Sequence, residues 1–277
     1  MTDKLNANVM VIGGGIGGMA TALSLQRRGF RVQVYERAKV IREVGAGVVI
    51  TANARRALRD LGVDAKLEAM SSTIDIFHTC HYATGEVLRA VSKEDISRKV
   101  GIASLGVYRA DLHSVLMEAV LANDPDCLHA QSEFASLTQD ATGVTVHFAN
   151  GASARADVVV GADGNASAVR SFLFPEEAPQ FAGQIAFRSL IPMHLVPDSV
   201  RARGSIMSAG PGRYLLSYPL RGGRLMNLIG LVQSGTWEEE GWTTPATKEE
   251  FAQAFGGFEP DLIELIHRIP EGEVFKW

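Results

Sequence analysis

The first residues in this chain that could do chemistry are the glycines of Gly13–Gly18. Gly13, Gly15 and Gly18 satisfy the spacing G-x-G-x-x-G, in which the first glycine permits a tight turn, the second lets a pyrophosphate approach the backbone and the third lets a helix pack closely. Glu36 follows about 20 residues later, where a carboxylate binds an adenosine ribose and disfavours a 2′-phosphate. The pattern indicates binding of FAD or NAD rather than NADP, and the alternative is an ordinary glycine-rich turn.

A second Asp-Gly turn occurs later in the chain, in the stretch GADGNASAVR at residues 161–170. It follows an apolar run, Ala156–Val160, that predicts a buried strand. The pattern D-G-x-x-S-x-x-R over Asp163–Arg170 is not expected in a doubly wound NAD dehydrogenase. The alternative is a capped strand-to-helix turn without a ligand, because a sharp turn alone accounts for Gly164.

The elements around the first glycine loop predict how it is held. Val9–Ile12 is a short β-branched apolar run that predicts a strand, and the small and apolar residues of Met19–Gln26 predict a helix. Arg31–Tyr35 alternates like a second strand. Strand, glycine turn, helix and strand within about 30 residues form a βαβ unit, which predicts a parallel sheet.

The rest of the chain interrupts this α/β pattern with antiparallel strands. Residues 73–91 predict two strands around the turn Ala83–Glu86, and residues 213–218 and 225–232 predict a second hairpin-like pair. Further strands are expected over residues 127–149, and helices over Ala52–Leu61, Ala110–Leu121, Lys248–Phe255 and Pro260–Ile266. We predict a nucleotide-binding domain of residues 1–72 and 101–172, interleaved with an antiparallel domain of residues 73–100 and 173–277.

The composition narrows the class of protein. The 277 residues are 46% hydrophobic, enough for a large core, and the formal net charge of −4 argues against a nucleic-acid surface. Two cysteines give no disulfide framework, and the first residues lack the features of a secretory signal. No apolar run approaches the roughly 20 residues that span a bilayer. These features predict a soluble cytoplasmic protein without nucleic-acid or membrane partners.

Several stretches together resemble the single-component FAD-dependent aromatic hydroxylases, typified by p-hydroxybenzoate, salicylate and 3-hydroxybenzoate hydroxylases. The resemblance is carried, in one order, by VIGGGIGG, VYER at 34–37, EVGAGVVI at 43–50, YRADLHSVL at 108–116 and GADGNASAVR. The later stretch YPLRGGRLMNLIGL, at 218–231, is most similar to the salicylate and 3-hydroxybenzoate branch.

This resemblance implies a Rossmann-like FAD-binding domain with a parallel sheet, interleaved with an antiparallel-sheet substrate domain. It implies that FAD is held without a covalent link, and that Ser167 and Arg170 brace the Asp-Gly turn. The implied FAD-binding positions are Gly13, Gly15, Gly18, Glu36, Arg37, Gly47, Val48, Arg109, Phe134, Asp163 and Gly164. For Arg109 the alternative is a surface arginine that starts a helix.

The resemblance also implies the reaction. FAD reduced by a transiently bound NAD(P)H reacts with O2 to form a hydroperoxide, which transfers OH to a phenolic aromatic acid such as a salicylate or hydroxybenzoate. The implied partners are therefore a small aromatic substrate, O2 and NAD(P)H, as in aromatic catabolism. A homodimer remains an open alternative.

Candidates for the ring-binding and catalytic residues lie in the strand-rich part. An arginine, Arg188, could pair with a substrate carboxylate, and Tyr214 or Tyr218 could hydrogen-bond a phenol oxygen, with His194 a weaker candidate. Tyr214 stands where hydroxylases of this branch can present a histidine, so the identity of the base stays open. Each of these residues has the alternative of being an ordinary sheet residue.

The cluster His78-x-Cys80-His81 does not predict a metal site. Side chains alternate along a strand, so His78 and Cys80 face one way and His81 the other. No second ligand pair follows at the spacing of a zinc site, and no Gly-x-Ser-x-Gly elbow of a hydrolase is present.

The chain departs from the family in one respect. The third family motif, a Gly-Asp pair with a proline-containing loop that holds the flavin ribityl chain, has no counterpart before Trp277. We therefore expect the sequence to be the N-terminal part of a longer protein. Two alternatives to the hydroxylase remain: another flavoenzyme of the same fold, such as a quinone-pathway hydroxylase or an isoprenoid reductase, and a non-catalytic FAD-binding fragment.

Overall fold

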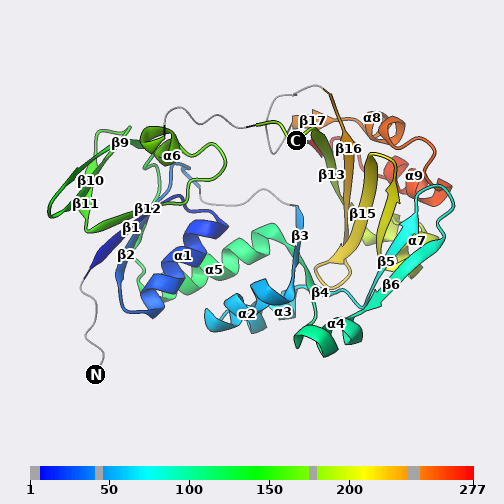
Figure 1. Cartoon of the computed structure of the whole chain (residues 1–277), viewed down its shortest axis with the longest axis horizontal. Coiled ribbons are helices and arrows are strands. Elements are labelled where there is room, and N and C mark those ends of the chain that lie inside the picture. The colour runs from blue at the N-terminus through cyan, green and yellow to red at the C-terminus, as the bar shows by residue number, and fades with distance from the viewer. Residues whose placement is uncertain (1–6, 41–45, 175–179, 236–243) are drawn as a thin grey trace. The chain divides into compact units, whose positions relative to one another are not determined.

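The computed structural model describes residues 7–40, 46–174, 180–235 and 244–277 (Figure 1). The chain divides into two compact units. Unit 1 comprises Met1–Glu43, Leu58–Asp64 and Ala110–Pro179, and unit 2 comprises Val44–Ala57, Ala65–Arg109 and Gln180–Trp277. Each unit alternates between distant parts of the sequence, so each is described by itself.

Unit 1 is built on a four-stranded parallel sheet with the order β12-β1-β2-β8. The predicted βαβ unit is confirmed as β1 (Asn8–Ile12), α1 (Ile16–Arg27) and β2 (Arg31–Tyr35); the outer strands are β8 (Leu128–His129) and β12 (Val158–Gly161). Ile12 is level with Tyr35 on one side and with Gly161 on the other. The turns that follow β1 and β12 therefore start at the same edge of the sheet, where parallel α/β sheets bind their ligands.

The prediction of one buried strand over Ala156–Val160 is wrong. The segment is divided between β11 (Ser153–Ala156) and β12, and Asp157 lies between them. The Asp157 carboxylate accepts a hydrogen bond from the Asn8 N–H at 2.7 Å. Val158 is 47% exposed, because within the described residues β12 is an outer strand of its sheet. A short apolar run does not by itself distinguish a central strand from an edge strand.

Both faces of the parallel sheet are covered inside unit 1. On one face α1 packs against β1 and β2, and α5 (Arg109–Asn123) lies beside α1, where the Asn123 amide donates to the Gln26 side chain at 3.1 Å. On the other face lies the antiparallel sheet β11-β10-β9, which contains β9 (Phe134–Asp140) and β10 (Gly143–Phe148). The core between the two sheets includes Met10, Ile12, Phe134, Val146, Phe148 and Val169, the last from α6 (Ala168–Leu173).

Unit 2 is built on an eight-stranded sheet with the order β17-β18-β13-β16-β15-β14-β5-β6. Both predicted hairpins are confirmed: β5 (Ile76–His81) pairs with β6 (Val87–Ser92), and β15 (Arg213–Leu220) pairs with β16 (Leu225–Gln233). The other strands are β13 (Gln184–Pro192), β14 (Ser205–Gly210), β17 (Thr244–Ala246) and β18 (Val274–Lys276). All neighbouring pairs are antiparallel except β14 and β5, which run parallel.

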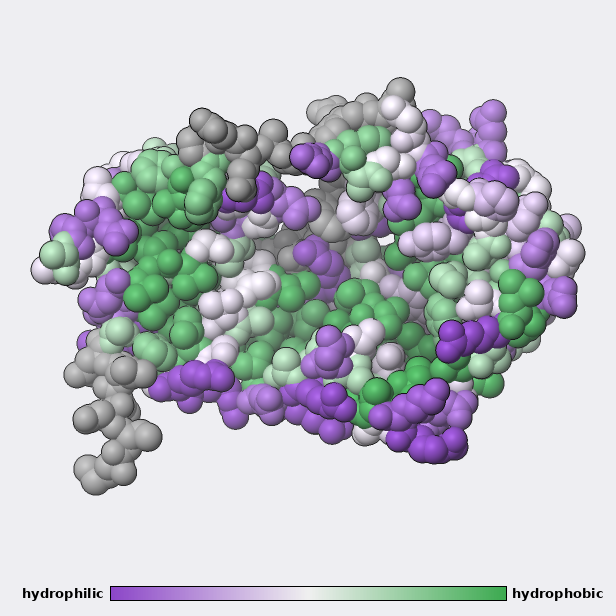
Figure 2. Space-filling view, in the orientation of Figure 1, coloured by the Kyte–Doolittle hydropathy of each residue, from purple (hydrophilic) through white to green (hydrophobic). Residues whose placement is uncertain are grey.

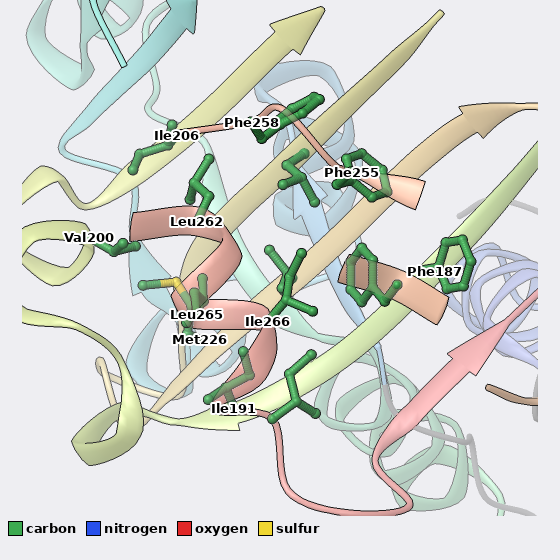
Figure 3. Close-up of a cluster of buried hydrophobic side chains, with 14 of the residues drawn as sticks. Phe187, Ile191, Val200, Ile206, Met226, Phe255, Phe258, Leu262, Leu265 and Ile266 are labelled. Atoms are coloured by element: carbon green, nitrogen blue, oxygen red, sulfur yellow. The ribbon is translucent and has the colours of Figure 1, made fainter. Parts of the chain in front are cut away.

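One face of this sheet is covered by the two predicted C-terminal helices, α8 (Lys248–Ala254) and α9 (Pro260–His267). Figure 3 shows helix side chains meeting side chains of the strands in one apolar cluster. The cluster includes Phe251, Phe255, Leu262, Leu265 and Ile266 from the helical segment and Phe187, Ile191, Ile206, Leu215, Met226 and Leu228 from the strands. The helices therefore bury one face of the sheet and leave the alternate strand positions for the other face.

A smaller antiparallel sheet, β3-β7-β4, also belongs to unit 2. It contains β3 (Gly47–Ile50), β7 (Leu105–Tyr108) and β4 (Ser72–Thr73), and β7 packs on β15 so closely that a Cβ built at Gly106 would lie 2.7 Å from the Pro219 carbonyl oxygen. This packing groups residues 44–57, 65–72 and 101–109 with unit 2, whereas the predicted FAD-binding domain includes them. As a functional division, the predicted boundaries stay a prediction.

The remaining elements are α2 (Ala52–Asp60), α3 (Asp64–Met70), α4 (Lys93–Val100), a 3-10 turn (Met193–Leu195) and α7 (Asp198–Arg203). Figure 2 shows the hydrophilic surface of α4, at the lower right, and no residue of this helix is buried. Ser92 begins α4 by accepting a hydrogen bond from the Asp95 N–H at 3.1 Å. Across the described residues, no helix combines the length and apolar character needed to cross a membrane.

Candidate functional site

The first glycine loop of unit 1 connects β1 to α1 and has room only for glycine at two of its motif positions. Gly13 has a φ of +108°, and a Cβ built there would lie 2.4 Å from the Ala162 carbonyl oxygen. A Cβ at Gly18 would lie 1.9 Å from the Gly13 carbonyl oxygen. The predicted tight turn and close helix packing are therefore both present.

The end of α1 that faces this loop is free to receive an anion. Gly15 is the N-cap of α1, no side chain among the described residues caps the helix, and no acidic residue lies in its first turn. A Cβ at Gly17 would meet nothing within 4 Å, so space is open beside the first turn. Unpaired N–H groups and the helix dipole favour a phosphate at such a position. The geometry of the loop fits the pyrophosphate of a dinucleotide.

Glu36 is fixed beside the glycine loop. Its carboxylate accepts a hydrogen bond from the Gly14 N–H at 2.6 Å and another from the Ala38 N–H at 2.9 Å. These contacts keep the negative charge close to the loop, where it suits ribose hydroxyls and opposes a second phosphate. The neighbouring Arg37, also predicted to bind the cofactor, is exposed at the surface.

The second turn, after β12, is braced as predicted. The Asp163 carboxylate accepts from the Ser167 hydroxyl at 2.6 Å and from the Val169 N–H at 3.1 Å. Ser167 caps α6 by accepting from the Arg170 N–H at 2.9 Å, and the Arg170 guanidinium donates to the Asn165 carbonyl at 2.6 Å. Gly164, with a φ of +86°, provides the left-handed residue of the turn.

The two glycine turns meet at the edge of the parallel sheet. The Ala162 N–H donates to the Ile12 carbonyl at 2.7 Å, and the Cβ position at Gly13 lies 2.9 Å from the Asp163 Cα. Segments about 150 positions apart thus form one surface of backbone groups around the loop. Phe134 lies elsewhere, 7% exposed within the core between the two sheets of unit 1, and that packing accounts for its aromatic side chain.

Sequence reasoning missed one residue of this arrangement. His113 on α5 is 2% exposed, and its Nε2 lies 2.6 Å from the Gly14 carbonyl oxygen. In the sequence, His113 is only one letter of the YRADLHSVL stretch. One signal could have indicated that His113 is buried: it stands next to Leu112 in a helix with many apolar residues. A buried polar side chain needs a hydrogen-bond partner.

In unit 2, the three predicted catalytic residues lie on one face of the eight-stranded sheet. The register places Tyr218 opposite Asn227, and Asn227 opposite Leu190, so these side chains share a face. Arg188 is two positions from Leu190, and Tyr214 is four positions from Tyr218, so both lie on this face as well. The alternate positions belong to the helix-covered core and include Phe187, Leu215 and Leu228.

The environment changes the ionisation of two of these side chains. Arg188 is 6% exposed, and burial together with the positive charge of Arg109 lowers the pKa of its guanidinium to about 10. The Arg188 guanidinium also lies 5.6 Å from the centre of the Trp277 ring. Tyr218 is 1% exposed, and burial raises the pKa of its phenol. Tyr214 is half-buried.

Gly47, one of the predicted FAD-binding positions, lies next to this face. Val44 and Gly45 lie outside the described residues; Gly47 and Val48 start β3 and are half-buried. The Gly47 N–H donates to Asn227 Oδ1 at 2.8 Å, and a Cβ at Gly47 would lie 2.6 Å from Asn227 Cγ. Asn227 was not predicted, because nothing local in YPLRGGRLMNLIGL relates it to a glycine 180 positions earlier. Arg109, the first residue of α5, donates its N–H to the Ala46 carbonyl at 2.9 Å.

Among the residues that the structure describes, no three His, Cys, Asp or Glu side chains gather as a metal site. In the cluster considered above, His78 Nδ1 lies 3.1 Å from the Arg203 carbonyl oxygen, and the Cys80 side chain is part of the apolar core. Burial raises the pKa of the Cys80 thiol. Both cysteines, Cys80 and Cys127, are buried and unbridged.

The fold and the glycine loop define a dinucleotide-binding protein, and comparison with known proteins gives the family. The family model described as FAD binding domain matches residues 6–256, so the chain belongs to this FAD-binding family. FAD is therefore its cofactor, and the open helix end, the fixed Glu36 and the glycine-only contacts are consistent with that cofactor.

The relatives are monooxygenases and hydroxylases by name. The chain is 33% identical over 259 residues to 3-amino-4-hydroxybenzoate 2-monooxygenase of Streptomyces platensis, covering 93% of this chain and 64% of that protein. It is 32% identical over 274 residues to 6-hydroxynicotinate 3-monooxygenase of Pseudomonas fluorescens (97% and 69%). It is 33% identical over 260 residues to 3-hydroxybenzoate 6-hydroxylase of Klebsiella oxytoca (94% and 65%). The chain thus spans about two thirds of the length of these relatives.

Solved structures share the fold. Klebsiella pneumoniae HpxO, in complex with FAD and uric acid, superposes with a TM-score of 0.84 at 23% identity, over 99% of this chain and 68% of that one. A salicylate hydroxylase substrate complex superposes with a TM-score of 0.78 at 24% identity, over 99% and 68%. These matches confirm the predicted p-hydroxybenzoate hydroxylase-like architecture.

Proposed function

We propose that the whole protein is an FAD-dependent monooxygenase that uses NAD(P)H and O2 to hydroxylate a phenolic or heteroaromatic acid. The observation that supports this proposal is that Arg188, Tyr214 and Tyr218 lie on one face of the unit 2 sheet. The proposal assigns cofactor binding to the glycine turns of unit 1 and substrate recognition to that face. Its setting is the cytoplasm, to which two unbridged cysteines are suited.

The cofactor side of the proposal uses groups described above. The first turn of α1 and Gly15 would hold the pyrophosphate, Glu36 the adenosine ribose, and the braced Asp163 turn the flavin side of the molecule. When bound, FAD supplies the redox chemistry, accepting electrons from NAD(P)H and activating O2. The protein itself must position the ring and exclude water.

The substrate side of the proposal starts from charge. Arg188 is buried and close enough to Arg109 for the second guanidinium to lower its pKa. Two neighbouring guanidinium groups make the electrostatic potential around Arg188 more positive, and a positive potential attracts an anion. A carboxylate could accept a bidentate pair of hydrogen bonds from a guanidinium at such a position. This favours an aromatic acid over a neutral phenol.

The tyrosines suit the other end of such a substrate. Because burial raises the pKa of Tyr218, its phenol stays protonated near neutral pH and can donate a hydrogen bond to the phenol oxygen of the ring. Such a bond stabilises the oxygen as its own proton leaves, which makes the ring more electron-rich. Tyr214, half-buried on the same face, is the candidate for contact with that proton.

The relatives support the substrate class. The three curated relatives are named for 3-amino-4-hydroxybenzoate, 6-hydroxynicotinate and 3-hydroxybenzoate, each an aromatic carboxylic acid with a hydroxyl group. A guanidinium at one end and phenol groups at the other would recognise both features. The chain shares enough with these proteins to expect the same class, and the ring substituents remain to be measured.

The test is an activity panel on the full-length protein loaded with FAD. NADH and NADPH consumption is followed with hydroxybenzoates and hydroxynicotinates, their methyl esters serve as controls, and products are identified by chromatography. We expect one or more acids to accelerate NAD(P)H oxidation and yield a hydroxylated product, and the esters to fail. An FAD-loaded protein that no acid stimulates would favour the other flavoenzymes of this fold. A protein that never retains FAD would refute the proposal.

A further inference from the structure

The phosphate loop of unit 1 is held from two sides at a single residue, Gly14. The Gly14 N–H donates to Glu36 Oε2 at 2.6 Å, and the Gly14 carbonyl oxygen lies 2.6 Å from His113 Nε2. A carbonyl oxygen can only accept, so His113 Nε2 carries the hydrogen and donates. Glu36 directly follows β2 and is 22 positions from Gly14 in the sequence. His113 lies on α5 and is 99 positions from Gly14.

Fixing the Gly14 carbonyl also fixes the next N–H. No peptide bond in the described residues is cis, and in a trans peptide the C=O and the following N–H point in opposite directions. Because the Gly14 carbonyl points at the His113 imidazole, the Gly15 N–H points away from α5. Among the described residues this N–H has no acceptor.

Gly15 is the position where the motif brings a pyrophosphate closest to the backbone. It is also the N-cap of α1, and within the described part of the chain no side chain caps the first turn of this helix. If the Gly14–Gly15 peptide were reversed, the Gly14 carbonyl oxygen would face the phosphate in place of the Gly15 N–H. The carbonyl oxygen and the phosphate oxygens are both acceptors and would repel one another. The direction of the Gly14–Gly15 peptide therefore decides whether the loop attracts or repels the anion.

We infer that His113 is a positioning residue for cofactor binding, which directs the Gly15 N–H toward the FAD pyrophosphate by holding the Gly14 carbonyl. The imidazole is 2% exposed, on a helix whose other buried side chains include Leu112, Val115, Leu116 and Val120. An apolar side chain would pack there at least as well as a histidine, since burying a polar ring costs free energy unless it is hydrogen-bonded. The inference rests on FAD being the cofactor.

The test is titration of the apoprotein with FAD, followed by flavin fluorescence, in His113→Leu, His113→Gln and Val120→Ala variants. His113→Leu keeps bulk and removes the donor, and we expect the Kd for FAD to rise about tenfold. His113→Gln offers an amide N–H at a similar reach, and we expect it to recover most of that loss. Val120→Ala loosens the same helix two turns further on, and we expect an unchanged Kd.

A competition with ADP locates the effect. ADP carries the pyrophosphate and adenosine without the flavin, so His113→Leu should weaken ADP and FAD by the same factor. A loss of FAD affinity with ADP unaffected would overturn the inference, as would a Val120→Ala variant that loses as much as His113→Leu. Equal FAD affinity of His113→Leu and the parent would also overturn it. A parent protein that binds no FAD would instead refute the cofactor on which the proposed function stands.

Discussion

The cofactor loop of unit 1 and the sheet face of unit 2 that carries Arg188, Tyr214 and Tyr218 are built in opposite ways. In unit 1 the proposed binding groups are backbone N–H groups of consecutive residues, and the Glu36 side chain holds one of these residues, Gly14, in place. In unit 2 the proposed binding groups are side chains on different strands, which the strand register places on one face. A loop made of backbone tolerates few residue types, whereas a face made of side chains can change its ligand by substitution.

The largest effect that would test this contrast is expected at Gly18. A Cβ at Gly18 would lie 1.9 Å from the Gly13 carbonyl oxygen, so Gly18→Ala must displace the loop. We expect FAD binding to be lost and the free energy of unfolding to fall by about 1–3 kcal/mol, the usual cost of overpacking. Gly17→Ala is the matched control for the change in stability, because its Cβ meets nothing within 4 Å. Equal free energies of unfolding for the two variants would contradict the backbone explanation.

On the sheet face, Arg188→Gln should separate substrate binding from cofactor binding. Loss of a charge-assisted pair with a carboxylate is expected to raise the KM for the aromatic acid about 10- to 100-fold. The Kd for FAD should stay within about twofold, since the proposed sites for the adenosine and pyrophosphate groups lie in unit 1. The measurement is steady-state kinetics beside an FAD titration. If Arg188→Gln instead lost affinity for FAD alone, Arg188 would be a cofactor-binding residue and not a substrate-binding residue.

Asn227 sharpens the comparison, because it anchors a glycine of unit 2 with a side chain, as Glu36 does in unit 1. Asn227→Leu keeps the size and leaves the Gly47 N–H without its acceptor, so we expect a loss of about 1–3 kcal/mol in the free energy of unfolding. Chemical denaturation of the two proteins checks this. A leucine variant as stable as the parent would show that the 2.8 Å contact adds nothing.

The smallest effect concerns pH. Burial raises the pKa of Tyr218 above that of an unfolded tyrosine, about 10, so the folded protein keeps this proton where the unfolded chain releases it. The stability contribution of Tyr218 is full below pH 10 and is lost as the pH rises above it. In Tyr218→Phe, the fall of stability between pH 9 and 11 should be shallower, by up to about 1.4 kcal/mol per pH unit. Parallel curves for the two proteins in denaturant titrations would refute this.

Much of the fold could be predicted where the signal is local. The signal for the βαβ unit lies within residues 13–36, and the signal for the turn after β12 lies within residues 163–170. Both predictions are confirmed. The hairpin of β5 and β6 follows from its own turn. The apolar run at 156–160 misled, because hydrophobic content alone does not say whether a strand has one neighbour or two.

For the candidate site, the sequence by itself determined the residues whose function depends on neighbours in the chain. Glycine at 13 and 18 is required by a turn of a few residues, and a strand end sets the position of Glu36. The tertiary structure alone decided that Arg188, Tyr214 and Tyr218 share a face, and that His113 and Asn227 hold glycines far away in sequence. Strand register and helix packing bring these residues together, and both depend on the whole core, which no local pattern records.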